Sequence, residues 1–185
     1  MQLIIGLVGE KGSGKGTFAK FLQEIVPESS YIRYSDILVE TLNLWSLPLT
    51  RSNYQNLANT MEKSFGRGTL ANATKERIKK LQANIVIVDG IRRWPEAKLI
   101  RSFSNNIIIY VTADINKRYQ NLKKKSGKVN EAGLSLKQFM KEEKDDAEIL
   151  IPEIGKTADF KIVNEGSLAA FRKQAEELWG MTVIA

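Results

Sequence analysis

Two residue types that carry much of enzyme chemistry are absent from this chain of 185 residues, which has no cysteine and no histidine. Without cysteine, neither a disulfide framework nor a thiolate zinc site can form. Without histidine, the usual general base, the imidazole metal ligand and the Ser-His-Asp triad are excluded. Any chemistry must therefore use lysine, arginine, carboxylates, hydroxyls and backbone groups.

The sequence also lacks a run of about 18 apolar residues, which a membrane-spanning helix would need. Residues 1–8 lead directly into a glycine-rich motif, so we interpret the N-terminus as part of the fold and not as a signal peptide. We therefore expect a cytoplasmic protein with no membrane partner. With 43% hydrophobic residues, the chain suits one domain that buries a sizeable core.

Basic residues outnumber acidic ones, and the net charge is +7. Such a balance favours anionic partners, either nucleic acid or small phosphorylated molecules. No motif that combines aromatic and basic residues for RNA binding is present, so nucleic acid is an alternative that we do not favour. Lysines gather at 123–125 and at 128, and a run of this kind is most often a solvated face.

The strongest motif is GEKGSGKGT at residues 9–17, which follows the apolar run at 3–8 and precedes a helical pattern. Strand, glycine-rich turn and helix form the context of a phosphate-binding loop. Glycines let the backbone turn several N–H groups toward one point, and the following helix adds its positive end. Lys15 is placed to reach the outer phosphates. The expected nucleotide-binding residues of this loop are Gly9, Gly12, Ser13, Gly14, Lys15, Gly16 and Thr17.

Two positions are candidates for handling Mg²⁺. The usual loop pattern places a metal-binding hydroxyl directly after the lysine, whereas here Gly16 intervenes and the hydroxyl comes at Thr17. The second candidate is Asp89, which ends the apolar run 85–88 and is followed by a glycine. An acid at such a strand end handles Mg²⁺ or its waters beside a phosphate-binding loop. Because of the displaced hydroxyl, we expect the metal to be held mostly through waters.

Apolar runs and amphipathic patterns alternate along the chain and predict a three-layer α/β/α P-loop fold with a five-stranded parallel sheet and a small lid. The expected strands are 3–8, 31–34, 85–90, 107–111 and 160–163. Ligands then bind at the carboxyl ends of the strands. Ser35-Asp36, Thr50 and Ser135 are expected to cap helices, the last of which should turn Phe139 and Met140 inward.

The loop variant G-x-x-G-x-G-K-G-T resembles the adenylate kinase type of nucleoside monophosphate kinase. The order of elements is similar to that superfamily over nearly the full length. Three short motifs, at residues 34–36, 89–92 and 163–166, resemble dephospho-CoA kinases and the archaeal-type nucleotide kinases related to them. This resemblance implies ATP as the donor, Mg²⁺ as the metal and a nucleotide-like acceptor.

The resemblance also implies roles for individual residues. Arg118 matches the arginine that stacks on adenine, and the loop from Asn164 to Gly166 matches the one that passes the base. Asp36 matches the acidic position facing the acceptor. Arg92, or its neighbour Arg93, matches the arginine that clamps an acceptor phosphate. In the lid, where the family has arginines, this chain has Lys124, Lys125 and Lys128.

The implied division of the chain is a core at 1–35, 83–122 and 157–185, acceptor-binding helices at 36–82 and a lid at about 123–135. Val39 stands where adenylate-kinase-like relatives carry an arginine, so a true adenylate kinase is disfavoured. The residues expected to act on the transferred phosphoryl group are Lys15, Asp36, Asp89, Arg92 and Lys124.

These residues suit phosphoryl transfer, which needs positioning and charge stabilisation more than covalent help. We expect an ATP-dependent kinase that acts on a nucleoside or deoxynucleoside monophosphate or on dephospho-CoA. A phosphate acceptor needs no base, whereas a hydroxyl acceptor would gain from Asp36. Two other classes stay open: an ATPase or nucleotide switch acting on RNA or protein, and a nucleotide-binding protein without turnover. The choice of acceptor, of ATP or GTP, and of oligomeric state is open.

Overall fold

The structure is a computed structural model that describes residues 2–125, 135–144 and 148–184. Its strands are β1 (Leu3–Val8), β2 (Ser30–Arg33), β3 (Ile85–Ile91), β4 (Asn106–Thr112) and β5 (Phe160–Val163). Its helices are α1 (Lys15–Ile25), α2 (Tyr34–Leu44), α3 (Arg51–Phe65), α4 (Thr69–Lys79), α5 (Trp94–Arg101), α6 (Ile115–Lys125), α7 (Leu136–Glu142), α8 (Ile151–Gly155) and α9 (Leu168–Ile184).

The five strands form one parallel sheet in the order β2-β3-β1-β4-β5, as the sequence predicted. After β1 the chain continues toward β2 on one side of the sheet, and from β4 it continues to β5 on the other side. Connections therefore diverge from the carboxyl ends of β1 and β4, which is where α/β sheets of this kind bind ligands.

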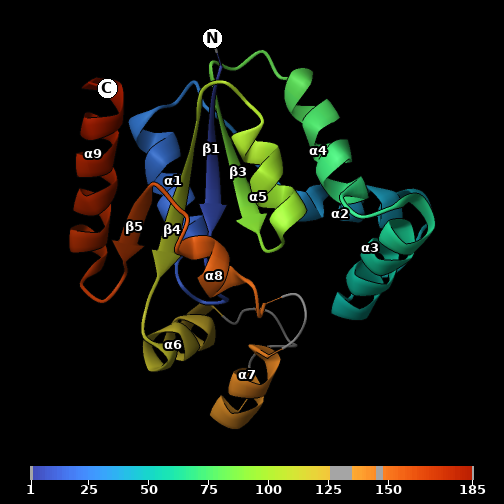
Figure 1. Cartoon of the computed structure of the whole chain (residues 1–185). Coiled ribbons are helices and arrows are strands. Elements are labelled where there is room, and N and C mark those ends of the chain that lie inside the picture. Colours follow the sequence, from blue (N-terminus) through green and yellow to red (C-terminus); the bar gives the residue numbers. More distant parts are fainter. Residues whose placement is uncertain (1, 126–134, 145–147, 185) are drawn as a thin grey trace.

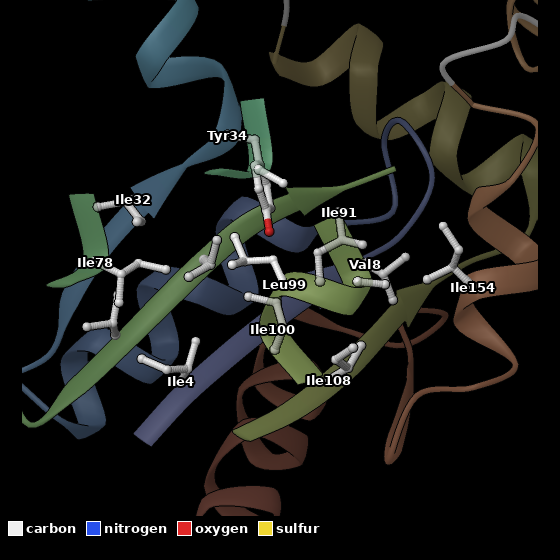
Figure 2. Close-up of a cluster of buried hydrophobic side chains, with 14 of the residues drawn as sticks. Ile4, Val8, Ile32, Tyr34, Ile78, Ile91, Leu99, Ile100, Ile108 and Ile154 are labelled. Atoms are coloured by element: carbon white, nitrogen blue, oxygen red, sulfur yellow. The ribbon is translucent and has the colours of Figure 1, made fainter. Parts of the chain in front are cut away.

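Helices cover both faces of the sheet and give it three layers (Figure 1). On one face, α4, α5 and α8 pack over β1, β3 and β4, and Figure 2 shows the isoleucines and Tyr34 that meet there. On the other face, α1 and α9 pack through a cluster that includes Phe18 and Phe171. Continuous apolar strands are explained by this arrangement, because a parallel sheet with both faces covered exposes neither side to water.

The helices α2, α3 and α4 also pack against one another, and Figure 1 shows α3 standing away from the strands. Thr50 caps α3 as predicted, because its side chain accepts a hydrogen bond from the Asn53 backbone N–H over 3.1 Å. The apolar stripe of α3 is only half-buried, and Phe65 at its end is 73% exposed. This group of helices therefore has less core of its own than the sheet.

Three details of the sequence prediction are wrong. The first residue of α2 is Tyr34, so Arg33 and not Ser35 or Asp36 is its N-cap; β2 runs into α2 without an intervening loop. Ser135 does cap α7 and Phe139 is buried, but Met140 is 47% exposed, because seven residues of helix present one narrow face. The helix α8 was not predicted at all, since five residues are too few for periodicity to reveal.

Among the described residues, no helix combines the length and the apolar character that crossing a membrane requires.

Candidate functional site

A cleft of about 620 Å³ lies at the carboxyl ends of the strands and is lined by segments that follow β1, β3, β4 and β5. The cleft gathers most of the residues that the sequence proposed for a site. Those in its wall are Gly12–Thr17, Asp89, Arg92, Lys124, Asn164 and Gly166. Four other proposed residues do not line it, namely Gly9, Asp36, Arg93 and Arg118.

The glycine-rich loop is held tightly against its surroundings. Gly12 and Gly14 have positive φ angles of 80° and 104°, which side chains rarely adopt. A Cβ on Gly14 would lie 2.5 Å from Nδ2 of Asn164, and a Cβ on Gly9 would lie 2.1 Å from the carbonyl oxygen of Val111. These glycines are therefore required by conformation and by close packing. Gly16 differs, because a Cβ there would meet nothing within 4 Å.

Lys15 begins α1, and its ammonium lies inside the loop. Its Nζ donates hydrogen bonds to the carbonyl oxygens of Gly9 over 2.5 Å and of Glu10 over 3.1 Å. Burial lowers the pKa of Lys15, whereas the negative charge of Asp89 raises it and the charge of Arg92 lowers it. A desolvated ammonium beside these charges is arranged to receive an anion, which would replace the water that burial has removed.

Asp89 lies near the end of β3 and is 8% exposed. Its Oδ2 accepts a hydrogen bond of 2.8 Å from the Tyr31 hydroxyl, and its Oδ1 is buried without a hydrogen-bond partner among the described residues. The same is true of Ser13 Oγ, which is buried and has no partner in the part of the chain that the structure describes. Within the described residues, no group of three carboxylates or other side-chain ligands could hold a metal without help. One orphan carboxylate oxygen and the Thr17 hydroxyl in the same cleft fit a metal that keeps several waters.

The structure separates the roles of Arg92 and Arg93. Arg92 lines the cleft with a half-exposed side chain, and its Nη1 lies 3.3 Å from Oε1 of Glu148. Arg93 points to α3, where it pairs with Glu62 over 3.5 Å and donates to Asn59 over 3.3 Å.

The backbone that carries both arginines is fixed by Glu96. Its Oε2 accepts hydrogen bonds from the backbone N–H of Arg92 over 2.6 Å and of Arg93 over 3.0 Å. Burial raises the pKa of Glu96 despite these two bonds. The Tyr34 hydroxyl in turn donates to the Glu96 carbonyl over 3.0 Å, so α2 supports the same turn.

Arg118 is not placed as the resemblance implied. Its side chain is buried and donates to the carbonyl oxygen of Ala113 over 2.9 Å and to both carboxylate oxygens of Glu143. The guanidinium also lies over the Phe139 ring, 5.7 Å from the centroid. In this arrangement Arg118 joins α6 to α7, and it has no face open to a base in the cleft.

The face of α6 that does line the cleft was missed by the sequence analysis. It carries Lys117, Asn121 and Lys124, which stand at positions i, i+4 and i+7. Nδ2 of Asn121 donates to the Gly12 carbonyl over 2.9 Å and so ties α6 to the glycine-rich loop. The helical spacing was the available signal, and only Lys124 of this set was predicted.

The loop after β5 closes another side of the cleft. Nδ2 of Asn164 donates to the Ser13 carbonyl over 3.0 Å, so this loop is fastened to the glycine-rich loop. Gly166 and Leu168 line the cleft, and Leu168 is 66% exposed. An exposed leucine beside a glycine offers an apolar surface at the edge of an otherwise polar cleft.

Asp36 lies outside the cleft wall and already has partners. Its Oδ2 accepts from the Arg33 backbone N–H over 2.8 Å, and its Oδ1 accepts from Arg33 Nε over 2.9 Å. These bonds make Asp36 part of the cap of α2. Most of the predicted lid, residues 126–134, lies outside the described residues.

The helix α7 contacts two sides of the cleft region through Glu142. Oε2 of Glu142 lies 3.2 Å from Nζ of Lys11 in the glycine-rich loop and 2.6 Å from Nη1 of Arg51 in the first turn of α3. Burial raises the pKa of Glu142, but the hydrogen bonds from these two cations outweigh it and bring the pKa below its usual value.

Comparisons with known proteins identify the family and support the fold. A family model described as an AAA domain matches residues 8–137. A UPF0200 protein of Sulfurisphaera tokodaii is 30% identical over 175 residues, which cover 95% of this chain and 94% of the relative. A UPF0200 protein of Staphylothermus marinus is 26% identical and is matched over 87% of its length, with 91% of this chain covered.

Solved structures with similar folds include kinases. A shikimate kinase from Acinetobacter baumannii in complex with shikimate has a TM-score of 0.61 and 14% identity, with 99% of this chain and 94% of that chain covered. TT1252 from Thermus thermophilus has a TM-score of 0.61 and 18% identity, with 97% of each chain covered. At these identities the likeness shows a shared P-loop kinase-like fold.

Proposed function

We propose that this chain, which belongs to the AAA domain family and to the UPF0200 proteins, is an ATP-dependent kinase that phosphorylates the phosphate group of a nucleotide-like small molecule. The observation that carries the proposal is the meeting of Lys15, Asp89 and Arg92 in one cleft. An ammonium, a metal-binding carboxylate and a guanidinium around one space are the parts that phosphoryl transfer requires.

The donor nucleotide is proposed to bind with its phosphates in the glycine-rich loop. Backbone N–H groups of Gly12–Thr17 and the start of α1 would face the β- and γ-phosphates. The base would then lie toward Gly166 and Leu168, where the cleft offers apolar surface. Arg118 has no part in holding the base in this arrangement, because its guanidinium is engaged by Glu143.

A phosphate acceptor is favoured over a hydroxyl acceptor such as dephospho-CoA. Among the described residues, Asp89 is the one carboxylate that lines the cleft, and its position suits a metal and not a base. Both oxygens of Asp36, the other candidate base, accept hydrogen bonds from Arg33. A phosphate acceptor is ionised at neutral pH and needs no base, so a nucleoside or deoxynucleoside monophosphate matches the cleft best.

The transfer itself would then rest on charge. An acceptor phosphate oxygen forms a bond to the γ-phosphorus while the bond from that phosphorus to the bridging oxygen of ADP breaks. Lys15 would stabilise the negative charge that develops on the donor phosphates. Arg92 would hold the acceptor phosphate in line with the bond that breaks. Mg²⁺, when bound through the open oxygen of Asp89 and the Thr17 hydroxyl, would neutralise phosphate charge.

The division of the chain is proposed on the same basis. The sheet with α1, α5, α6 and α9 would hold the donor. The group α2–α4 would shape the acceptor pocket, with Arg93 fastening α3 to the turn that carries Arg92. Residues 123–135 would act as a lid that excludes water, and Lys124 is its described cation in the cleft.

The direct test is acceptor-stimulated release of ADP from ATP and Mg²⁺ across a panel of nucleoside monophosphates, deoxynucleoside monophosphates and dephospho-CoA. We expect turnover with at least one monophosphate and none with dephospho-CoA. Turnover with dephospho-CoA alone would contradict the phosphate-acceptor assignment. Hydrolysis of ATP that no small acceptor stimulates, together with salt-sensitive RNA binding, would favour an ATPase acting on a macromolecule. Tight ATP binding without any turnover would indicate a binding protein.

A further inference from the structure

Glu148 is a buried carboxylate beside the cleft for which the proposed function, as described so far, has no use. Its side chain is 9% exposed and faces the 50% exposed side chain of Arg92. In the part of the chain that the structure describes, Arg92 is the ion-pair partner of this carboxylate. The charges of both residues also act on the ammonium of Lys15, which places the pair at the same centre.

The stability of the fold does not require a charged side chain at position 148. Removing an ionised carboxylate from water costs free energy that a single pair of 3.3 Å with a half-exposed arginine repays only in part. An apolar side chain of similar size at position 148 would serve the packing at least as well. Glu148 lies three residues before Ile151, the first residue of α8, and its backbone carbonyl accepts a hydrogen bond from the Ile151 N–H over 3.1 Å. Because Ile151 and Ile154 are fully buried, the backbone at Glu148 is attached to a packed helix (Figure 2 shows Ile154).

What Glu148 does is hold the outer end of Arg92. The backbone of Arg92 is fixed by the hydrogen bond that its N–H donates to Glu96 over 2.6 Å. The Nη1 of the guanidinium lies 3.3 Å from Oε1 of Glu148, and the Arg92 side chain lines the cleft. A planar guanidinium presents several donors in a fixed fork, so holding one edge orients the rest.

We propose that Glu148 is a positioning residue that orients the Arg92 guanidinium for the acceptor phosphate, an inference that rests on the proposed kinase function. An arginine side chain loses rotamer freedom when it binds a ligand, which costs free energy. If Glu148 already restricts the Arg92 side chain in the free protein, less of this cost remains when the acceptor binds. Glu148 would therefore lower the concentration of acceptor that the enzyme needs, while the donor site is unaffected.

The test compares Glu148→Gln with the wild-type chain in steady-state kinetics. Glutamine keeps the size of the side chain and removes its charge. We expect the acceptor KM to rise by about tenfold to a hundredfold, since a displaced binding group has effects of that order. The KM for ATP and the melting temperature should stay close to wild type. The control Glu24→Gln removes a carboxylate that pairs with Arg172 over 2.6 Å away from the cleft, and it should leave both KM values unchanged.

A double-mutant cycle shows whether Glu148 acts through Arg92. In an Arg92→Ala background, Glu148→Gln should add no further loss in acceptor KM, because the group it orients is gone. An acceptor KM unchanged in Glu148→Gln, or a loss that adds fully to that of Arg92→Ala, would overturn the inference.

A spectroscopic readout needs no acceptor and separates this inference from the proposed function. In ¹⁵N–¹H spectra of the free protein at low temperature, the Arg92 Nη–H groups should give separate resonances, because an ion pair at Nη1 slows rotation of that group. That resonance pattern should become the averaged one of mobile arginines in Glu148→Gln. An unchanged Arg92 signal in the variant would show that Glu148 does not orient it, whatever the activity. Wild-type protein without acceptor-stimulated ADP release would instead contradict the kinase function.

Discussion

The Tyr31 hydroxyl donates a hydrogen bond of 2.8 Å to Oδ2 of Asp89, and Oδ1 of the same carboxylate is buried with no partner in residues 2–125, 135–144 and 148–184. The two residues come from neighbouring parallel strands, β2 and β3. One oxygen is thus held by the protein while the other is left for a ligand. Burial and the Asp89 charge raise the pKa of Tyr31, so its hydroxyl remains a donor throughout the neutral range. In metal sites, the carboxylates that bind the metal are typically oriented by such a hydrogen bond from a neighbouring side chain.

Replacing Tyr31 with Phe should weaken the response to Mg²⁺. Because Asp89 would lose the bond that orients it, the Mg²⁺ concentration for half-maximal turnover should rise by about tenfold. Mn²⁺ binding in the presence of ADP, followed by electron paramagnetic resonance, should weaken by a similar factor. ADP binding in a chelator, measured by calorimetry, is the control and should not change. An unaltered Mg²⁺ dependence would mean that Tyr31 is only a packing residue.

The variant Lys15→Met should separate activity from stability. Turnover should fall by about a thousandfold, since Lys15 is proposed to act on charge that develops during transfer. The melting temperature at pH 7 should hold or rise. Burial lowers the pKa of Lys15 below its ordinary 10.5, so the penalty of keeping a poorly solvated ammonium is complete below the lowered folded pKa and disappears as pH rises to 10.5. Methionine removes this penalty. Turnover near the wild-type level would show that the site is misplaced.

Replacing each of two loop glycines with alanine should have different effects on stability. Gly14→Ala should destabilise the fold by about 1–3 kcal/mol, because φ is 104° and the new Cβ would lie 2.5 Å from Nδ2 of Asn164. Gly16→Ala should leave the melting temperature unchanged, since its Cβ would meet nothing within 4 Å. As Gly16 lines the cleft, that variant should bind ATP more weakly in calorimetry. Equal melting temperatures for the two variants would contradict the loop geometry.

Glu96 should make stability depend on pH. Burial raises its pKa above the ordinary value of 4.5, so its contribution to folding is complete below that pH. The contribution is lost as pH rises through the raised folded value. Glu96→Gln lacks this titration, so its free energy of unfolding should improve relative to wild type as pH rises above 4.5. Urea denaturation of both proteins at several pH values measures the difference. A constant difference across this range would be evidence against a raised pKa.

The sequence predicted the sheet and the strand, glycine-rich loop and helix at its start well because both are encoded locally. Continuous apolar runs favour a covered parallel sheet, and the loop glycines all fall within residues 9–16. The short helix α8 and the true N-cap of α2 escaped prediction, since five residues carry too little periodicity and β2 joins α2 directly.

The positions of the side chains on α6 and after β3 could not be predicted from the sequence, because they depend on contacts with distant segments. The Arg118 guanidinium is held by Glu143, the C-cap residue of α7, which lies 25 residues later in the chain. Its neighbour Lys117 takes a place in the cleft wall, one helical position away. Arg92 and Arg93 diverge for the same reason, since Glu148 and Glu62 come from different parts of the fold. Adjacent residues of one type are told apart only by such partners.

Alanine at Arg92 and at Arg93 should therefore give two distinct defects. Arg92→Ala should raise the acceptor KM by about ten- to a hundredfold, the range expected for one charged hydrogen bond, and leave hydrogen exchange in α3 unchanged. Arg93→Ala should instead lower the melting temperature and increase hydrogen exchange in α3, because α3 would lose the contacts of Arg93 with Glu62 and Asn59. Steady-state kinetics and exchange measured on both variants decide the matter. If Arg93→Ala rather than Arg92→Ala impaired acceptor binding in a fully folded protein, the acceptor phosphate would have to approach from the α3 side.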